Sequence, residues 1–229
     1  MTPIRLALVD DQALVRAGFR MVLDAQPDMR VVAEAADGHE ALAVLDATSA
    51  DVVLMDIRMP RLDGVAATEQ LCRRPDAPRV IVLTTFDLDE YAHAALRAGA
   101  SGFLLKDAGP EELLSAIRSV HAGDSVIAPS TTRRLIEHFA DQLGTPPSSA
   151  APDPAADPRL AQLTARETEV LVAVARGLTN AEISAQLHLA EATVKTHIGR
   201  ILSKCQLRDR VQMVLLAYES GLVEVRPQS

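Results

Sequence analysis

Residues 52–64 read VVLMDIRMPRLDG, and this stretch joins a strand signal to a candidate reactive residue. Val52–Met55 is a continuous apolar run, which is typical of a strand buried on both faces. Asp56 follows that run directly. Ligands of open α/β sheets bind outside the carboxyl ends of the strands, so Asp56 is predicted at the functional edge of a sheet.

Four further apolar runs predict strands of the same kind, at Arg5–Val9, Val31–Ala35, Val80–Leu83 and Gly102–Leu105. Amphipathic stretches that predict helices follow the five runs, at Ala13–Ala25, Glu40–Thr48, Val65–Arg73, Asp89–Ala98 and Glu111–His121. Five strand–helix repeats favour a parallel sheet covered by helices. Residues 1–125 are therefore predicted to form a doubly wound, flavodoxin-like α/β domain with five parallel strands.

The composition indicates a globular protein, with 48% hydrophobic and 24% charged residues. No apolar stretch approaches the roughly 20 residues of a membrane span, and no basic region followed by an apolar run resembles a signal peptide. Cys72 and Cys205 match no metal-ligand spacing. We expect both cysteines to be free thiols in a cytoplasmic protein. We expect no membrane partner.

A Pro-rich segment predicts a division of the chain. Residues 144–158 read GTPPSSAAPDPAADP and cannot build a core. We interpret them as the flexible part of a linker over residues 126–159 that begins with a helical segment. The alternative is a long ordered loop within one domain, which is uncommon at this length.

The part after the linker contains helix signals and no strand signal. Helices are expected at Ala165–Ala175, Asn180–Leu187, Glu191–Cys205 and Asp209–Ser220. Two capping boxes, Thr164 with Glu167 and Thr179 with Glu182, indicate two helix starts, and Gly177 and Gly221 suit helix ends. Residues 160–225 are thus predicted to form a small all-α helix-turn-helix domain.

The net charge of −8 argues against nucleic-acid binding by the chain as a whole. The acidic excess lies in residues 1–125, however, whereas residues 190–210 hold five basic and two acidic side chains. An acidic first part and a locally basic last part suggest two separate roles. Only the last part is expected to face phosphates.

Polar residues follow other predicted strands as well as Val52–Met55. Asp10 and Asp11 follow the first strand, Thr84 the fourth and Lys106 the fifth. Three carboxylates at one edge would require a cation, and oxygen ligands suit Mg²⁺. A hydroxyl and an ammonium could then hold a phosphoryl group on a nucleophilic carboxylate. Taken singly, these residues would be helix caps, a strand-end hydroxyl and a solvated lysine.

Residues 9–11, 55–64, 83–85 and 102–106 together resemble the receiver domain of response regulators. The resemblance implies that Asp56 is the phosphoacceptor, that Mg²⁺ binds Asp10, Asp11, Asp56 and the main-chain carbonyl of Arg58, and that Thr84 and Lys106 contact the phosphoryl group. Phe103 occupies the aromatic switch position, although it also suits a core aromatic. The sequence departs from many receivers at Lys106-Asp107, where Lys-Pro is common.

The helix predicted at Glu191–Cys205 has a buried stripe and a basic opposite face. Val194, Ile198, Ile201 and Cys205 recur at helical spacing. The opposite face carries small and basic residues that suit the DNA major groove: Lys195, Thr196, Gly199, Arg200, Ser203 and Lys204. An ordinary solvated amphipathic helix is the alternative for this segment taken alone.

Residues 163–171, 177–183 and 191–201 strongly resemble the LuxR-type helix-turn-helix. The resemblance implies that Glu191–Cys205 is the recognition helix and Asp209–Ser220 the dimer helix. Lys195 and Thr196 would contact the groove, Thr193, His197 and Arg200 would lie near phosphates, and Lys204 adds to the DNA-binding set. Three departures are Ala190 at the helix cap, Gly199 at a base-reading position, and Cys205-Gln206 where Leu-Gly is common.

Both resemblances together identify a two-component response regulator of the NarL/FixJ class. They imply a protein without enzymatic turnover, phosphorylated on Asp56 by a sensor histidine kinase, that forms a homodimer on promoter DNA. Receivers of this class often pair through their first and fifth helices. A haloacid-dehalogenase-like phosphatase would need Asp-x-Asp rather than Asp10-Asp11, and a ligand-sensing LuxR-type regulator would need more aromatic residues. A phosphorylation-independent receiver usually lacks site residues that are present here.

Overall fold

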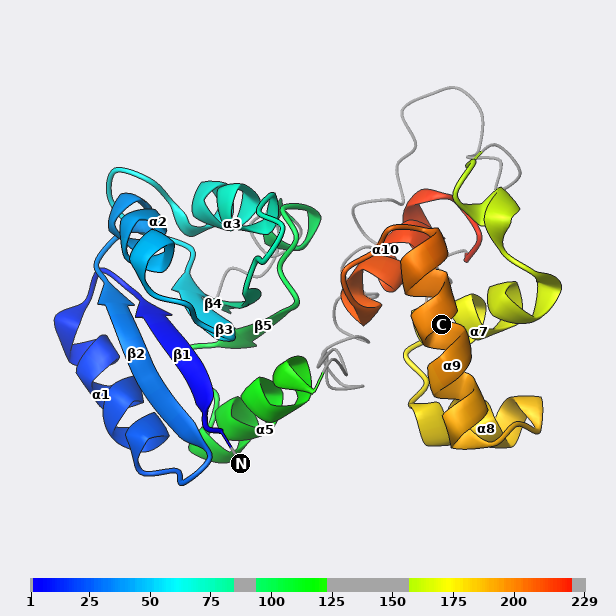
Figure 1. Ribbon diagram of the computed structural model, residues 1–229, viewed down its shortest axis with the longest axis horizontal. Coiled ribbons are helices and arrows are strands. Elements are labelled where there is room, and N and C mark those ends of the chain that lie inside the picture. The colour runs from blue at the N-terminus through cyan, green and yellow to red at the C-terminus, as the bar shows by residue number, and fades with distance from the viewer. Residues whose placement is uncertain (1, 85–93, 123–156, 224–229) are drawn as a thin grey trace, which may run out of the picture. The chain divides into compact units, whose positions relative to one another are not determined.

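The structure is a computed structural model that describes residues 2–84, 94–122 and 157–223 (Figure 1). The chain divides into two compact units, residues 1–126 and residues 127–229. Most of the predicted linker, including residues 144–156, lies outside the described residues.

The first unit is built on a five-stranded sheet, as predicted. Its strands are β1 Ile4–Val9, β2 Met29–Ala35, β3 Val52–Asp56, β4 Arg79–Thr84 and β5 Gly102–Leu105. They lie in the order β2-β1-β3-β4-β5, and every neighbouring pair is parallel. The register pairs Asp56 with Leu83 and Thr84 with Leu105, so β3, β4 and β5 end at one edge.

Helices cover both faces of this sheet, namely α1 Ala13–Asp24, α2 Gly38–Ala47, α3 Gly64–Cys72 and α5 Pro110–His121 (Figure 1). Leu23 of α1 and Ile117 of α5 belong to one core cluster with Leu6 and Leu54, which places these two helices on the same face. Of the helix predicted at Asp89–Ala98, residues 94–97 are helical and residues 89–93 lie outside the described part.

The second unit is all-helical, and the four predicted helices are confirmed within one or two residues at each end. They are α7 Ala165–Ala175, α8 Asn180–Leu187, α9 Glu191–Lys204 and α10 Arg210–Glu219, preceded by a short 3₁₀ helix at Leu160–Gln162 that the sequence pattern did not indicate. Their apolar faces meet in one core that includes Val174, Ile183, Val194, Ile201 and Leu216.

The local start and stop signals of these helices act as the sequence indicates. Both capping boxes form, at Thr164 with Glu167 and at Thr179 with Glu182. Gly177 and Gly221 end helices with φ of 79° and 71°. Ala190 provides no side-chain cap for α9. Gln206, which stands where glycine is common, adopts a left-handed φ of 55° that costs a non-glycine residue conformational energy.

Among the described residues, no helix combines the length and the apolar character needed to cross a membrane.

Candidate functional site

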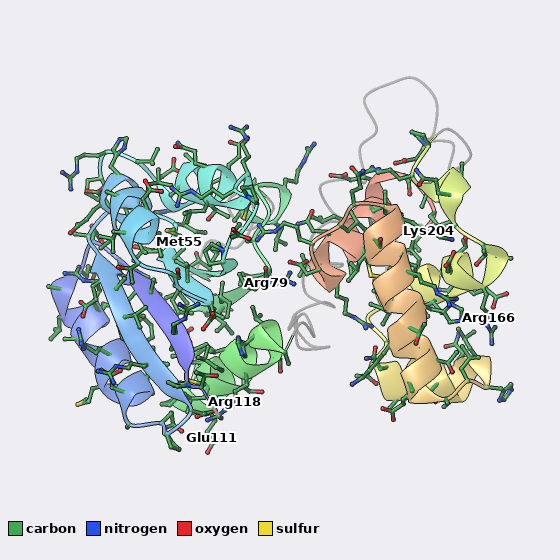
Figure 2. All side chains as sticks on the ribbon, viewed as in Figure 1. Met55, Arg79, Glu111, Arg118, Arg166 and Lys204 are labelled. Atoms are coloured by element: carbon green, nitrogen blue, oxygen red, sulfur yellow. The ribbon has the colours of Figure 1, made fainter. Side chains whose placement is uncertain are left out.

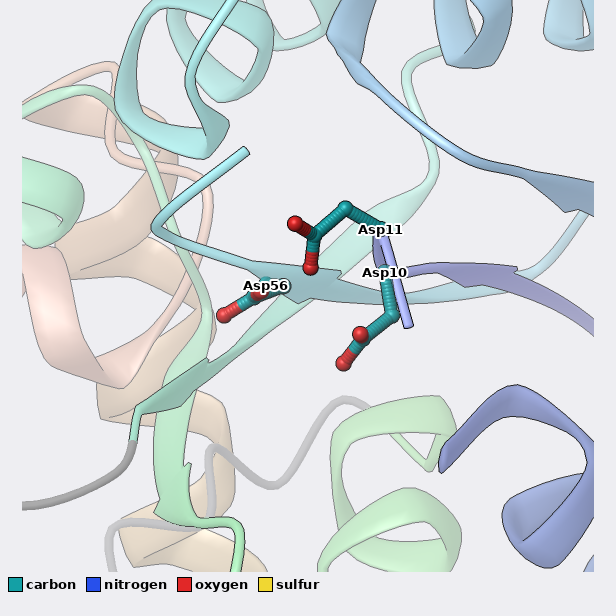
Figure 3. A group of neighbouring side chains, drawn as sticks. All are labelled: Asp10, Asp11 and Asp56. Atoms are coloured by element: carbon teal, nitrogen blue, oxygen red, sulfur yellow. The ribbon is translucent and has the colours of Figure 1, made fainter. Parts of the chain in front are cut away.

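Three carboxylates converge at the carboxyl edge of the sheet, as predicted (Figure 3). Asp56 is the last residue of β3, and Asp10 and Asp11 directly follow the neighbouring strand β1. One carboxylate oxygen from each of the three lies within 4.8 Å of the others. Asp10 and Asp56 are buried, whereas Asp11 is exposed. The cluster is open to solvent on the Asp11 side and could hold a cation there.

Lys106, which follows β5, brings a positive charge to this cluster. Its Nζ lies 2.7 Å from Asp10 Oδ2 and 2.9 Å from Asp56 Oδ2. The main-chain N–H of Lys106 donates to the carbonyl of Thr84 at 2.7 Å, which fixes the residue beside the end of β4. Burial lowers the pKa of the Lys106 ammonium, but the bonds to Asp10 and Asp56 outweigh that effect and raise it. The side chain is therefore cationic at neutral pH.

The pKa of the Asp56 carboxyl is raised above its ordinary value. Burial is the main cause, and the nearby Asp10 charge adds to it. The hydrogen bond and charge of Lys106 act in the opposite direction without cancelling the rise. A single lysine shared between two buried carboxylates thus leaves the site short of positive charge.

A pocket of about 150 Å³ opens at this point, lined by Asp11, Gln12, Asp56, Ile57, Arg58, Thr84 and Lys106. Since one water occupies about 30 Å³ of liquid, the space suits a small hydrated anion together with a cation. Thr84 and Lys106 thus reach the pocket, as predicted from the strand ends. Phe103 is buried in β5 and is not among the lining residues, so its switch role stays a prediction.

The loop after Asp56 is packed so closely that only glycine fits at position 64. A Cβ on Gly64 would lie 1.9 Å from the main-chain oxygen of Asp56. The Gly64 N–H also donates to the carbonyl of Ile57 at 2.9 Å. Asp63 caps α3 by accepting from the Ala66 N–H at 2.8 Å. Together these contacts fix the backbone on which Asp56 and Arg58 stand. No cis peptide bond occurs in the described residues, Lys106–Asp107 included.

Sequence reasoning did not identify two residues that bear on the acidic cluster. Gln12 lines the pocket, and its N–H donates to Asp10 Oδ1 at 2.9 Å. Arg16 reaches back from α1 to the main-chain oxygen of Asp10 at 2.6 Å. Both contacts depend on how the turn between β1 and α1 folds, and no strand-end pattern reports that geometry.

In the second unit, α9 presents the polar face that the sequence predicts. Lys195, Thr196, Gly199 and Arg200 are exposed, and Thr193 and His197 are half-buried. Val194 and Ile201 are fully buried on the opposite face. The Thr196 hydroxyl donates to the carbonyl of Ala192 at 2.9 Å. A helix face that carries basic side chains and few bulky ones fits a DNA groove.

Lys204 differs from the rest of the predicted DNA-binding set. Its Nζ lies 2.7 Å from Glu167 Oε2, so the ammonium of α9 pairs with a carboxylate of α7 (Figure 2 labels Lys204). Glu167 is 2% exposed and also accepts from the Thr164 N–H at 2.8 Å. The hydrogen bond from Lys204, followed by that from Thr164, lowers the pKa of the Glu167 carboxyl to about 2. The predicted role of Lys204 in DNA contact therefore competes with an internal one.

Two family models match the chain. The model described as the response regulator receiver domain matches residues 6–118. The model described as bacterial regulatory proteins, luxR family, matches residues 161–217. Each match falls within one of the two compact units.

Relatives with known names match nearly the whole chain. The chain is 44% identical to the uncharacterized transcriptional regulatory protein YxjL of Bacillus subtilis (strain 168), over 96% of this chain and 98% of the relative. It is 38% identical to the transcriptional regulatory protein LiaR of the same organism, over 96% and 99%. The crystal structure of the response regulator ChrA of a heme-sensing two-component system is similar with a TM-score of 0.52 at 35% identity, over 97% and 100%. Two of these relatives are named as transcriptional regulatory proteins and the third as a response regulator, which agrees with the expectation of a protein without enzymatic turnover.

Proposed function

This chain belongs to the two-component response regulators of the NarL/FixJ class, and on that premise we propose that Asp56 accepts a phosphoryl group and thereby controls DNA binding. The observation that carries the proposal is the Lys106 ammonium, bonded to both Asp10 and Asp56 at the rim of a solvent-open pocket. The phosphoryl donor is a histidine of a partner sensor kinase. A carboxylate oxygen of Asp56 forms the bond to phosphorus as the phosphorus–nitrogen bond breaks.

The residues of the acidic cluster fit a magnesium ion. Three carboxylates with one shared lysine leave an excess of negative charge on oxygen atoms, which are the ligands that Mg²⁺ prefers. Asp10, Asp11, Asp56 and the main-chain carbonyl of Arg58 would hold it. When bound, the ion neutralises charge on the phosphoryl oxygens during transfer.

Two further side chains act on the phosphoryl group itself. Lys106 is already cationic and within hydrogen-bond reach of Asp56, so its ammonium can move to a phosphoryl oxygen once Asp56 is modified. The Thr84 hydroxyl lines the same pocket and donates to a second oxygen. Phe103 lies in the strand next to Thr84 and follows its movement. The changed surface of the receiver then favours a homodimer.

The output is sequence-specific binding to promoter DNA by α9. Lys195 and Thr196 would contact base edges, and Thr193, His197 and Arg200 would lie near phosphates. A homodimer would place two copies of α9 on two half-sites, which raises the effective concentration of the second contact. Residues 1–125 form the receiver, residues 126–159 the linker and residues 160–225 the DNA-binding domain in this proposal.

The first test is the intact mass after incubation with acetyl phosphate and Mg²⁺. We expect one added phosphoryl group, lost in Asp56→Asn. The matched control is Asp63→Asn, which changes an exposed carboxylate of the same loop and retains a capping side chain. Equal phosphorylation of the wild type and Asp56→Asn would overturn the assignment of the phosphoacceptor.

A further inference from the structure

One arginine outside the pocket holds the main chain of the acidic cluster. Arg16 lies in the first half of α1 and is 17% exposed at its side chain. Its Nη1 donates to the main-chain oxygen of Asp10 at 2.6 Å. That oxygen belongs to the peptide that joins Asp10 to Asp11. Arg16 therefore contacts the connection between two of the three clustered carboxylates.

The guanidinium of Arg16 is itself fixed on its other side. Its Nε donates to Glu34 Oε2 of β2 at 3.4 Å. Glu34 Oε1 accepts from Arg20 Nη1 at 2.5 Å, and Arg20 also pairs with Asp24 at 3.2 Å. Asp24 in turn accepts from the Val31 N–H of β2 at 3.0 Å. This chain of ion pairs ties one side of α1 to β2 and leaves Arg16 little freedom.

Hydrogen bonds consequently hold the main chain on both sides of the Asp10 α-carbon. The Asp10 N–H donates to the carbonyl of Ala35 at 3.2 Å, as the last bond between β1 and β2. The Asp10 carbonyl, beyond the end of β1, takes its bond from Arg16. Because Asp11 begins at this peptide, the bond from Arg16 also restricts where the Asp11 backbone, and with it the Asp11 carboxylate, can lie.

We propose that Arg16 is a positioning residue for Mg²⁺, holding the Asp10–Asp11 peptide so that both carboxylates face one cation. The inference rests on the proposed function, since it concerns the same acidic cluster. Residues that orient metal ligands without touching the metal typically contribute about 10- to 100-fold in affinity. Glu34 balances the positive charge of Arg16, so the guanidinium can lie close to a cation site.

Charge and positioning predict opposite effects of removing this arginine. Deleting a positive charge beside a cation site tightens cation binding if charge alone matters. Deleting the bond that orients Asp10 and Asp11 weakens it. A weaker affinity in Arg16→Gln is therefore a signature of positioning that a charge effect does not produce.

The experiment is calorimetric titration of the full chain with MgCl₂, without a phosphoryl donor. We expect Arg16→Gln to weaken the Mg²⁺ affinity by about tenfold or more. Arg16→Lys retains the charge but not the planar guanidinium that reaches two partners, so its affinity should lie between those of Arg16→Gln and the wild type. The matched control is Arg20→Gln, which removes another partner of Glu34 without touching Asp10 and is expected to change the affinity less than twofold. Asp11→Asn shows whether the measured site is this cluster.

A second readout needs no metal. In the magnesium-free chain, the amide resonance of Asp11 is expected to shift in Arg16→Gln and to remain in place in Arg20→Gln. Unchanged or tighter Mg²⁺ binding in Arg16→Gln, or equal weakening in both arginine variants, would overturn the inference. Absence of Mg²⁺ binding in the wild type would instead contradict the metal site of the proposed function.

Discussion

The two units each contain a buried carboxylate bonded to a lysine, and the two carboxylates respond in opposite ways. Lys106 lies 2.9 Å from Asp56 in the first unit, and Lys204 lies 2.7 Å from Glu167 in the second. Asp56 is 4% exposed and Glu167 is 2% exposed. Nevertheless the pKa of Asp56 is raised, whereas that of Glu167 is lowered to about 2.

Burial is the largest influence on the pKa of Asp56, whereas the hydrogen bond from Lys204 is the largest at Glu167. The number of donors at each carboxylate adds to this difference. Glu167 has Lys204 and, in addition, the N–H and hydroxyl of Thr164 at 2.8 and 3.0 Å. Asp56 shares Lys106 with Asp10, and the charge of Asp10 opposes its ionisation. Glu167, with three donors on Oε2, serves structure, whereas Asp56, which shares its lysine, retains the capacity that the proposed function requires.

The largest expected effect comes from crowding the Asp56 backbone with Gly64→Ala. The added methyl group would lie 1.9 Å from the Asp56 main-chain oxygen, so the loop must move. We expect a loss of about 3 kcal/mol or more in the free energy of unfolding, measured by denaturant titration, together with loss of phosphorylation. The control is Gly18→Ala, where nothing lies within 4 Å of the new Cβ. That variant should gain up to about 1 kcal/mol from helix propensity.

Replacing each lysine by methionine separates the two pairs directly. Lys106→Met removes a cation from the acidic cluster, so Mg²⁺ should bind about tenfold tighter or more. Lys204→Met should leave Mg²⁺ affinity unchanged and destabilise the second unit, because Glu167 would remain buried without its cation. Calorimetric Mg²⁺ titration and thermal unfolding of both variants provide the measurements. Equal changes in Mg²⁺ affinity would remove the distinction between the pairs.

The salt dependence of DNA binding distinguishes the two roles of Lys204. A lysine that contacts a phosphate contributes about one unit to the slope of log affinity against log salt. Because Lys204 pairs with Glu167, we expect Lys204→Met to weaken DNA binding without changing that slope. Arg200→Gln, which alters an exposed residue of the same helix, should reduce the slope. A reduced slope in Lys204→Met would restore it as a DNA contact.

Acid should affect the two carboxylates with opposite sign. The folded-state pKa of Glu167 lies below its ordinary value of 4.5, so its ionisation stabilises the fold above that pH, and this contribution is lost as pH falls toward about 2. The pKa of Asp56 is raised, so its ionisation opposes folding at neutral pH. Glu167→Gln should therefore flatten the loss of stability in acid. Asp56→Asn should raise stability at pH 7 without Mg²⁺, as followed by urea unfolding across this pH range.

The smallest expected effect concerns the start of α9. Lys204 fixes the last turn of this helix, but Ala190 gives its first turn no side-chain cap. Ala190→Ser should stabilise the second unit by about 1 kcal/mol in thermal unfolding. Ala190→Val, which supplies no cap hydroxyl at this exposed and extended position, is the control. No gain from serine would mean that the first turn of α9 is satisfied by other groups.

Most of the fold and of the candidate site could be predicted from the sequence, because both follow from short-range patterns. Buried strands produce continuous apolar runs, and a parallel sheet brings the residues after Val9, Met55 and Leu83 to one edge. Interactions between distant side chains left no such pattern. The helical period places Lys204 beside the outward face of α9, yet its long chain reaches back to Glu167 of α7.

The sequence likewise did not indicate some features of the backbone. Arg61 adopts a left-handed φ of 67° in the loop after Asp56, and its guanidinium pairs with the fully buried Asp37. An arginine does not indicate a left-handed backbone from the sequence alone, and nothing in the sequence indicated the pair with Asp37. The bond from Arg16 to Asp10 likewise depends on the turn that leads into α1.

The order of the strands in the sheet has a consequence for how the protein is made. The acidic residues emerge early from the ribosome, but Lys106 follows β5, the last strand in sequence and an edge strand in space. In the described sheet β5 pairs with β4 alone, so the pocket needs that pairing to be complete. A nascent or truncated chain that ends before residue 106 carries Asp10, Asp11 and Asp56 without the lysine that pairs with two of them. Such a chain lacks one part of the proposed phosphorylation site, so the site depends on β5 joining the sheet.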